Sequence, residues 1–367
     1  MTDVLASVDA AAGALIGDAT LSGEELHLVL GGCYLRLRSN SGALVEHLRG
    51  YFGHVLGPAR DPDLDVLAIE REAPELEMDF IDWAREPGKT GRKDSYRDLP
   101  GGRLIRKVRT GMVFLQSESR RVAAGPCNKY DNQVINFVNA QYMNWLQHRG
   151  WRICHAAGLV HRGSCLGIAG FSGGGKSTLM LRLLDDAGVN YLTNDRLFIR
   201  SDGEQVQAVG IPKLPRVNPG TIVHNPCLQA LIPAAQRDEL LALPAAQLWE
   251  LEEKYDVLVE DLYGAGRITP QAPLAAFLVL NWQRGSDRPL EVQPVDLDER
   301  RDLLAAIMKS PGPFYQYPDG TFYRDTTRLD EEAYLAALEG VSLYEASGGV
   351  DFDALQSYCL NELMSDW

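Results

Sequence analysis

The sequence lacks the features that would place the protein in several specialised classes. It has no apolar run of membrane-spanning length, and its start, Met1 to Val4, lacks the basic residues of a signal peptide. Its six cysteines are scattered without a C-x-x-C pair, which favours reduced thiols over a disulfide framework or a zinc site. Internal repeats and low-complexity tracts are also missing. These absences predict a globular, cytoplasmic protein that does not bind membranes.

The chain also lacks an excess of positive charge. Its net charge of −14 over 367 residues argues against general nucleic-acid binding, which requires a basic surface. The charge is uneven, because residues 85–121 hold eleven Lys and Arg against four acids, or +7, and the remainder carries −21. This basic segment is either the solvated face of a hairpin or a docking patch for an acidic partner or a phosphorylated substrate.

One glycine-rich stretch, residues 170–178 with the sequence GFSGGGKST, fits the phosphate-binding pattern G-x-x-x-x-G-K-[ST]. The backbone N–H groups of such a loop surround phosphates, and its glycines allow the close approach. Lys176 is expected to reach the β- and γ-phosphates, and Ser177 to ligate Mg²⁺. The candidate nucleotide-binding residues are Gly170, Gly173, Gly174, Gly175, Lys176, Ser177 and Thr178.

The flanking sequence supports this interpretation. Residues 166–169 form a short apolar run typical of a buried strand, and residues 179–184 have the composition of a helix. A strand, a glycine loop and a helix in this order are the expected context of a phosphate-binding loop. The sequence therefore predicts that the protein binds a nucleoside triphosphate, and the alternative is a glycine-rich turn that binds nothing.

Hydropathy patterns predict the remaining elements. A polar, Gly- and Pro-containing loop is expected over 84–102, and a hairpin over 104–116. Further strands are expected at 26–30, 34–38, 64–70, 153–160, 190–193, 197–200 and 276–282. Further helices are expected at 43–55 and 132–149, and near 297–309, 330–339 and 351–365.

Two residues are the leading candidates for chemistry. Asp195 follows the strand after the loop's helix, which places it at the carboxyl edge of the sheet, where it would face the phosphates. Its alternative is a turn-capping role. His155 lies on the strand before the loop's strand, where it could lie beside the γ-phosphate, but by itself it is interpreted as a core histidine. Lys213 and Arg216 lie on a proline-rich loop, which suits either a phosphate clamp or an ordinary surface loop.

A second motif, Asn128-Lys129-Tyr130-Asp131, matches the N-K-x-D pattern by which GTPases recognise guanine. It precedes the glycine loop, so this interpretation would require a circularly permuted GTPase. In that fold the motif ends a buried strand, which residues 123–127 do not suggest. We instead expect Asp131 to be the N-cap of the helix that begins at residue 132, and ATP to be preferred over GTP.

With His155, the glycine loop and Asn194-Asp195 in this order, the sequence resembles the HPr kinase/phosphorylase family, which phosphorylates a serine of a small phosphocarrier protein. The resemblance implies an α/β fold: a P-loop core of the HPr kinase/PEP carboxykinase type over 129–310, a smaller N-terminal α+β domain over 1–128 and a C-terminal helical extension over 311–367. It also implies that Asp195 acts as the base, that His155 stabilises the transferred phosphoryl group, and that ATP and Mg²⁺ are the cofactors.

The chain departs from the family pattern at Asn194, where the family has an acid, and it lacks a clear second metal-binding glutamate. Residues 191–197, 212–216 and 348–352 look like the HPr-kinase-related B branch, whose members resemble gene-cluster proteins found beside an ATP-grasp enzyme. This implies an acceptor encoded in the same cluster.

The resulting prediction is a Mg-ATP-dependent kinase acting on a hydroxyl of a protein Ser/Thr or of a small molecule. Lys176, Asp195 and His155 are its catalytic residues, and Ser177 and Asp195 its candidate metal ligands. A nucleotide-hydrolysing switch and a nucleotide-binding scaffold are the alternatives, and homo-oligomerisation is left open.

Overall fold

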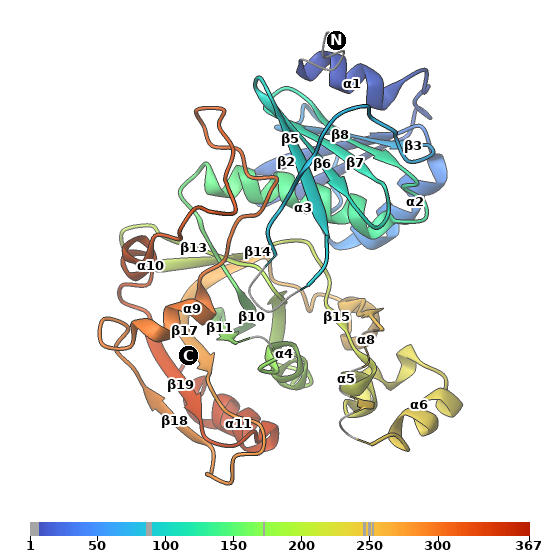
Figure 1. Ribbon diagram of the computed structural model, residues 1–367. Coiled ribbons are helices and arrows are strands. Elements are labelled where there is room, and N and C mark those ends of the chain that lie inside the picture. The colour runs from blue at the N-terminus through green and yellow to red at the C-terminus, as the bar shows by residue number, and fades with distance from the viewer. Residues whose placement is uncertain (1–6, 86–89, 172, 245–246, 249–250, 252) are drawn as a thin grey trace. The chain divides into compact units, whose positions relative to one another are not determined.

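The computed structural model describes residues 7–85, 90–171, 173–244, 247–248, 251 and 253–367. It is a mixed α/β structure with two large sheets (Figure 1). Its contacts divide it into two units. The first contains Met1–Gly150 and Ser310–Arg328, and the second contains Trp151–Lys309 and Leu329–Trp367.

The first unit is built on an eight-stranded sheet of order β1-β2-β3-β8-β7-β6-β5-β4. Neighbouring strands are antiparallel, except that β3 runs parallel to both β2 and β8. The strands are β1 Glu25–Leu30, β2 Cys33–Ser39, β3 Leu64–Glu70, β4 Ile81–Asp82, β5 Asp94–Leu99, β6 Gly102–Lys107, β7 Val113–Ser117 and β8 Arg121–Gly125. The helices are α1 Val8–Ile16, α2 Gly42–Tyr51, the short η1 Gly53–Val55 and α3 Asp131–Gln147.

A buried arginine explains why residues 310–328 belong to the first unit. Arg103, on β6, is fully buried and donates hydrogen bonds to the carbonyl oxygens of Pro313 at 3.1 Å and Tyr323 at 2.9 Å. From α3, Asn144 donates to the carbonyl oxygen of Phe314 at 2.8 Å. Because buried donors and acceptors must be paired, these bonds fasten the returning segment to the first unit.

The second unit contains a nine-stranded sheet whose main path is β12-β10-β11-β17-β14-β13-β9, with β19 pairing β17 and β18 pairing β19. Its strands are β9 Arg152–Cys154, β10 Ala156–His161, β11 Ser164–Gly170, β12 Val189–Thr193, β13 Leu197–Ser201, β14 Val206–Gly210, β17 Gln271–Leu280, β18 Glu291–Pro294 and β19 Ser342–Ser347. A separate two-stranded sheet pairs β15 Arg216–Val217 with β16 Tyr255–Asp256.

Helices and short turns complete the second unit. The α4 helix packs against β10, β11 and β12, while α5 packs against α6 and η2 (Figure 1). The bounds are α4 Lys176–Leu184, α5 Pro219–Val223, η2 Pro226–Leu231, α6 Ala234–Leu241, α8 Val259–Tyr263, η3 Arg301–Leu303, α9 Leu304–Ile307, α10 Glu331–Ala337, α11 Phe352–Tyr358 and η4 Cys359–Leu363.

Strand directions bring several chain segments to one edge of this sheet. β11 runs parallel to β17, β17 runs parallel to β19, and β10 is antiparallel to both β11 and β12. The carboxyl ends of β11, β12, β17 and β19 therefore meet at the same edge as the amino end of β10. In open α/β sheets, ligands bind outside the carboxyl ends of the strands. We call this region the carboxyl edge.

Many of the sequence-based expectations are confirmed. The strand, glycine loop and helix are present, as are the hairpin of β6 and β7 and the strand over residues 64–70. The expected strand 153–160 is instead two strands, β9 and β10, because the chain bends at His155. The polar region 84–102 was wrongly expected to be only a loop, since β5 lies within it; residues 86–89 of that region lie outside the described part.

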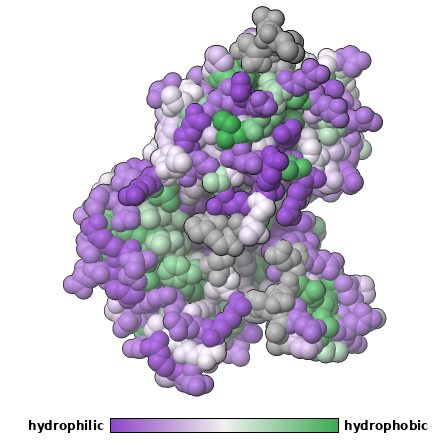
Figure 2. Space-filling view, in the orientation of Figure 1, coloured by the Kyte–Doolittle hydropathy of each residue, from purple (hydrophilic) through white to green (hydrophobic). Residues whose placement is uncertain are grey.

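The division of the chain also differs from the expected boundaries at 128 and 310. Helix α3 belongs to the first unit, so the second begins at Trp151. Residues 311–367 do not form a helical extension: 310–328 return to the first unit, and β19 joins the central sheet of the second beside β17. None of the described helices is both long enough and apolar enough to cross a membrane. The face in Figure 2 carries mainly hydrophilic side chains.

Candidate active site

The glycine loop, residues 170–175, connects β11 to α4 at the carboxyl edge. Gly173 and Gly175 have φ angles of +75° and +86°, in the region that favours glycine. A Cβ atom at Gly175 would lie 2.5 Å from the ring of Phe352, and one at Gly174 would lie 2.9 Å from the carbonyl oxygen of Phe171. The backbone path therefore needs glycine here. Ser172 lies outside the described residues.

Two side chains that follow the neighbouring strand β17 donate hydrogen bonds to the backbone of the loop. The indole Nε1 of Trp282 donates to the carbonyl oxygen of Gly174 at 2.8 Å, and Nη2 of Arg284 donates to that of Gly173 at 2.5 Å. The α4 helix that follows has no side-chain N-cap. Backbone N–H groups at such a helix start are the donors that anions accept from, and the helix dipole adds to the attraction.

The three residues that begin α4 are half-buried. Lys176 Nζ donates to the carbonyl oxygen of Gly170 at 2.9 Å, so the ammonium group lies across the mouth of the loop. The Thr178 hydroxyl lies 3.4 Å from the hydroxyl of Thr221, on α5. The hydroxyl of Ser177 occupies the position that the motif assigns to a metal ligand.

Asp195 and His155 form an ion pair at the same edge. Asp195 follows the carboxyl end of β12, and His155 immediately precedes β10, the strand between β12 and β11. His155 Nε2 lies 3.3 Å from Asp195 Oδ1, and Arg196 Nε lies 3.7 Å from Asp195 Oδ2. The two sequence candidates for chemistry are therefore brought together.

The surroundings of Asp195 keep its carboxylate ionised. Desolvation by the surrounding protein would raise its pKa, but the hydrogen bond from His155 and then the positive charges of Lys309 and Arg196 outweigh it. The net effect holds the pKa of Asp195 far below its usual range. Its side chain nevertheless remains 43% exposed, so an incoming group can reach the carboxylate.

Lys213 and Arg216 lie on the segment between β14 and α5. The carbonyl oxygen of Lys213 accepts a hydrogen bond from the Tyr191 hydroxyl at 2.6 Å, which fixes the backbone there. Arg216 lies 2.9 Å from Asp256 across the two-stranded sheet. Both residues therefore lie in the second unit, and Arg216 pairs with a carboxylate; their role as a phosphate clamp stays a prediction.

The N-K-x-D motif belongs to the first unit. The expectation that no buried strand precedes it was wrong, because β8 ends at Gly125 just before it. Asp131 is the first residue of α3 and not its N-cap, and it pairs with His47 at 2.5 Å. Asn128 accepts a hydrogen bond from the Ser41 hydroxyl at 3.1 Å. The motif therefore belongs to a different unit from the glycine loop, and Asn128 and Asp131 have partners within that unit.

Much of the basic segment 85–121 is paired within the first unit. Lys107 lies 2.6 Å from Asp94, and Arg92 lies 2.7 Å from Asp82. The guanidinium of Arg106 lies over the ring of Phe80, with its carbon 4.3 Å from the ring centroid. These contacts favour the structural interpretation of the segment over that of a docking patch.

Sequence reasoning missed Trp282, Arg284 and Lys309 as contributors to the site. The available signal for the first two was an aromatic and a basic residue directly after an apolar strand. Lys309 follows α9, and only the tertiary structure brings it to Asp195. Within the described residues, no cluster of three or more His, Cys, Asp or Glu side chains could hold a metal ion by itself.

No family model matches the sequence, and no curated protein matches it. Among solved structures, the chain is similar to the Hpr(Ser) kinase/phosphatase from Coxiella burnetii, with 14% identity and a TM-score of 0.28. The similarity covers 59% of this chain and 98% of that one. It is too low to assign a fold or an activity.

Proposed function

We propose that the protein is a kinase that transfers the γ-phosphoryl group of Mg-ATP to a hydroxyl group. The observation that carries this proposal is the shared position of the glycine loop and the His155–Asp195 pair at one edge of one sheet. Phosphoryl transfer needs positioning, charge neutralisation and an acceptor for the hydroxyl proton. The carboxyl edge contains side chains suited to each of these tasks.

The loop residues would hold and neutralise the phosphates. Backbone N–H groups at the start of α4 and the ammonium of Lys176 offer positive charge to the β- and γ-phosphates. Lys176 would exchange its bond to the Gly170 carbonyl for a phosphate oxygen. The hydrogen bonds from Trp282 and Arg284 would fix the backbone of the loop before nucleotide binds.

Mg²⁺ fits this site through shared ligands. The hydroxyl of Ser177 and phosphate oxygens are hard oxygen ligands, which Mg²⁺ prefers, and it usually retains several waters. When bound, Mg²⁺ would neutralise charge on the phosphates. Asp195 offers a carboxylate beside the loop, so it would serve either the metal or the acceptor.

Asp195 would accept the proton of the acceptor hydroxyl. Its low pKa keeps it in the basic form at neutral pH, and its exposed side chain leaves room for the hydroxyl. His155 would hold the carboxylate in position and stabilise the transferred group. Asn194 is uncharged, so it cannot replace Asp195 as a base.

The test pairs Asp195→Asn with Asp238→Asn, an exposed acid on α6 in the same unit. Each variant is incubated with γ-labelled ATP and cell extract, and ATP affinity and labelled product are measured together. We expect Asp195→Asn to lower product formation by about 10²-fold or more, the worth of a positioned base, with ATP affinity changed only a few-fold. Asp238→Asn should resemble the wild type.

Other outcomes would separate the alternatives. Loss of affinity together with activity would make Asp195 a metal ligand instead of a base. A wild type that releases phosphate from ATP but labels no protein or metabolite would favour a nucleotide-hydrolysing switch. A wild type that binds ATP without turnover would favour a scaffold.

A further inference from the structure

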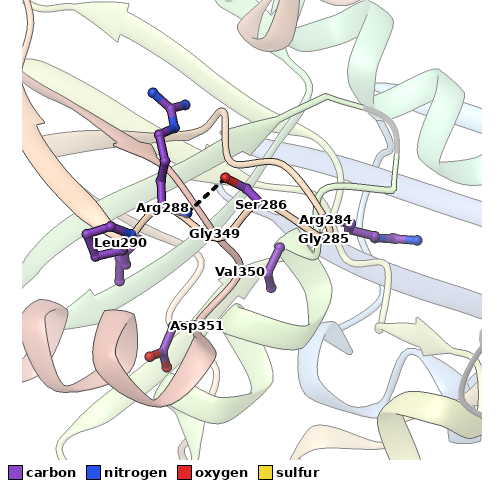
Figure 3. A pocket seen from close by; sticks show the side chains of 9 residues that line it. Arg284, Gly285, Ser286, Arg288, Leu290, Gly349, Val350 and Asp351 are labelled. Atoms are coloured by element: carbon purple, nitrogen blue, oxygen red, sulfur yellow. Dashed lines mark hydrogen bonds between the residues drawn. The ribbon is translucent and has the colours of Figure 1, made fainter.

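A cavity of about 470 Å³ lies beside the glycine loop in the second unit (Figure 3). Its walls come from two segments, residues 284–290 after β17 and residues 349–351 after β19. Because β17 and β19 are parallel neighbours, both segments leave the sheet at the carboxyl edge. A cavity of this volume is in the range of small-molecule sites.

The cavity and the glycine loop share structural supports. Arg284, which lines the cavity, donates the hydrogen bond to the carbonyl oxygen of Gly173. Phe352 follows the lining residue Asp351, and its ring packs on Trp282 with centroids 5.0 Å apart and lies against Gly175. The glycine loop and the cavity are therefore neighbours that share supporting side chains.

The cavity lies on the opposite flank of the loop from Asp195. In the sheet, β10 and β12 lie on one side of β11, and β17 and β19 lie on the other. His155 and Asp195 belong to the first side, whereas all the lining residues belong to the second. For a nucleotide whose γ-phosphate is near Asp195, we expect the α-phosphate and nucleoside to extend toward the side of the loop where the cavity lies.

The chemistry of the lining suits a nucleoside better than an anion. Leu290 and Val350 supply apolar surface, and Val350 is a large apolar side chain that the protein leaves exposed. Two arginines line the cavity, but in Figure 3 the guanidinium of Arg288 is directed away from Val350 and Asp351, and that of Arg284 is bonded to the Gly173 carbonyl oxygen. Nucleobases bind through their apolar faces, and carboxylates accept hydrogen bonds from ribose hydroxyls.

We propose that this cavity is the nucleoside subsite, an inference that rests on the proposed nucleotide-binding function. Val350 and Leu290 contact the base. Asp351 uses Oδ1 to cap α11 through the backbone N–H of Ala354 at 2.9 Å, and its other oxygen, Oδ2, accepts from a ribose hydroxyl. Arg284 joins the nucleoside subsite to the phosphate loop.

The experiment compares the binding of ATP with that of inorganic tripolyphosphate, which has the phosphates but no nucleoside. We expect Val350→Trp, which fills the cavity from an exposed position, to weaken ATP binding about tenfold or more and to leave tripolyphosphate binding within about twofold. Asp351→Asn keeps a good N-cap residue, so it should weaken ATP binding several-fold without changing the unfolding temperature. Leu241→Trp, on α6, is the matched exposed control.

Photolabelling with 8-azido-ATP provides an independent location for the base. We expect labelled peptides to contain residues 284–290 or 349–351, and the label to be lost with excess ATP. If the label maps elsewhere, or if Val350→Trp leaves ATP binding unchanged while the wild type binds both ligands, this inference is overturned and the phosphate site stands. If the wild type binds neither ligand, the proposed function fails and this inference fails with it.

Discussion

Each unit contains a cluster of acidic and basic side chains, and the two clusters differ in how completely their groups are paired. In the first unit, Arg103 is 0% exposed and donates to both carboxylate oxygens of Asp98 and to two carbonyl oxygens. Its guanidinium also lies near the rings of Tyr96 and Phe322. In the second unit, Asp195 is 43% exposed, and its contacts to His155 and Arg196 are longer, at 3.3 and 3.7 Å.

This difference separates a structural cluster from a candidate site. A buried arginine is tolerated only when its donors are satisfied, and the Arg103 cluster meets that requirement while fastening residues 310–328. The Asp195 cluster instead leaves a carboxylate accessible at an edge where four strands end. A high local count of basic residues in the sequence does not distinguish the two cases, whereas exposure and position in the sheet do.

The largest effect is expected from Lys176→Ala, at the same edge as Asp195. Phosphoryl transfer should fall by about 10³-fold or more, because charge neutralisation at the phosphates is lost in a site arranged for anions. The unfolding temperature should change little, since the ammonium is only half-buried and its bond to the Gly170 carbonyl oxygen lies at the surface of the loop. Labelled-product formation and thermal unfolding are the measurements, and Lys254→Ala, an exposed lysine of the same unit, is the control. Wild-type turnover in the Lys176 variant would contradict the phosphate-loop assignment.

The converse test is Arg103→Met, which should lower the free energy of unfolding and leave phosphoryl transfer unchanged. Asp98 is partly exposed and keeps Arg324 as a partner, so the main cost is the loss of the donors to the carbonyl oxygens of Pro313 and Tyr323. At about 1–3 kcal/mol for each buried group left without its hydrogen bond, the free energy of unfolding of the first unit should fall by about 2–5 kcal/mol. Arg92→Met is the matched control, because Arg92 and Asp82 form an exposed pair worth about 0–1 kcal/mol. Denaturant unfolding measures both variants. Equal effects from the two substitutions would remove the distinction between the clusters.

The glycine loop and most strands of the carboxyl edge could be predicted from the sequence, because these segments have clear local signals. Strand β19 could not be predicted, because buried and exposed residues do not alternate along it and one of the buried residues is Glu345. That carboxylate is tolerated because Asn281 and Arg300 pair with it at 2.6 and 2.5 Å. Pairings between distant segments, like the position of Lys309 near Asp195, follow from the tertiary structure and leave no local signature.

A smaller effect, in the pH dependence, should come from His155→Ala. In the folded protein the Asp195 pKa lies below its unfolded value, so the carboxylate stays ionised, and its contribution to stability is present at neutral pH and lost only in strong acid. The acid limb of the rate profile should therefore lie below about pH 4, the ordinary range of aspartate. The hydrogen bond from His155 is the largest cause that lowers the pKa of Asp195, so its removal should move the acid limb to higher pH.

The control is His161→Ala, at the other end of β10, which should leave the rate profile unchanged. If the acid limb does not move in the His155 variant, the limb does not report the titration of Asp195.

The smallest effect is expected from Asp131→Ala in the first unit. If the N-K-x-D motif read guanine, this substitution would reduce GTP binding sharply. Asp131 instead pairs with His47, on α2, and the motif belongs to a different unit from the glycine loop. We therefore expect ATP to be preferred over GTP in both the wild type and the variant, with the ratio of affinities unchanged within about twofold. The free energy of unfolding should fall by less than about 1 kcal/mol, as for other exposed pairs.

Competition between labelled ATP and unlabelled GTP measures the ratio of the two affinities. A GTP preference that disappears in the variant would assign the motif a role in guanine recognition.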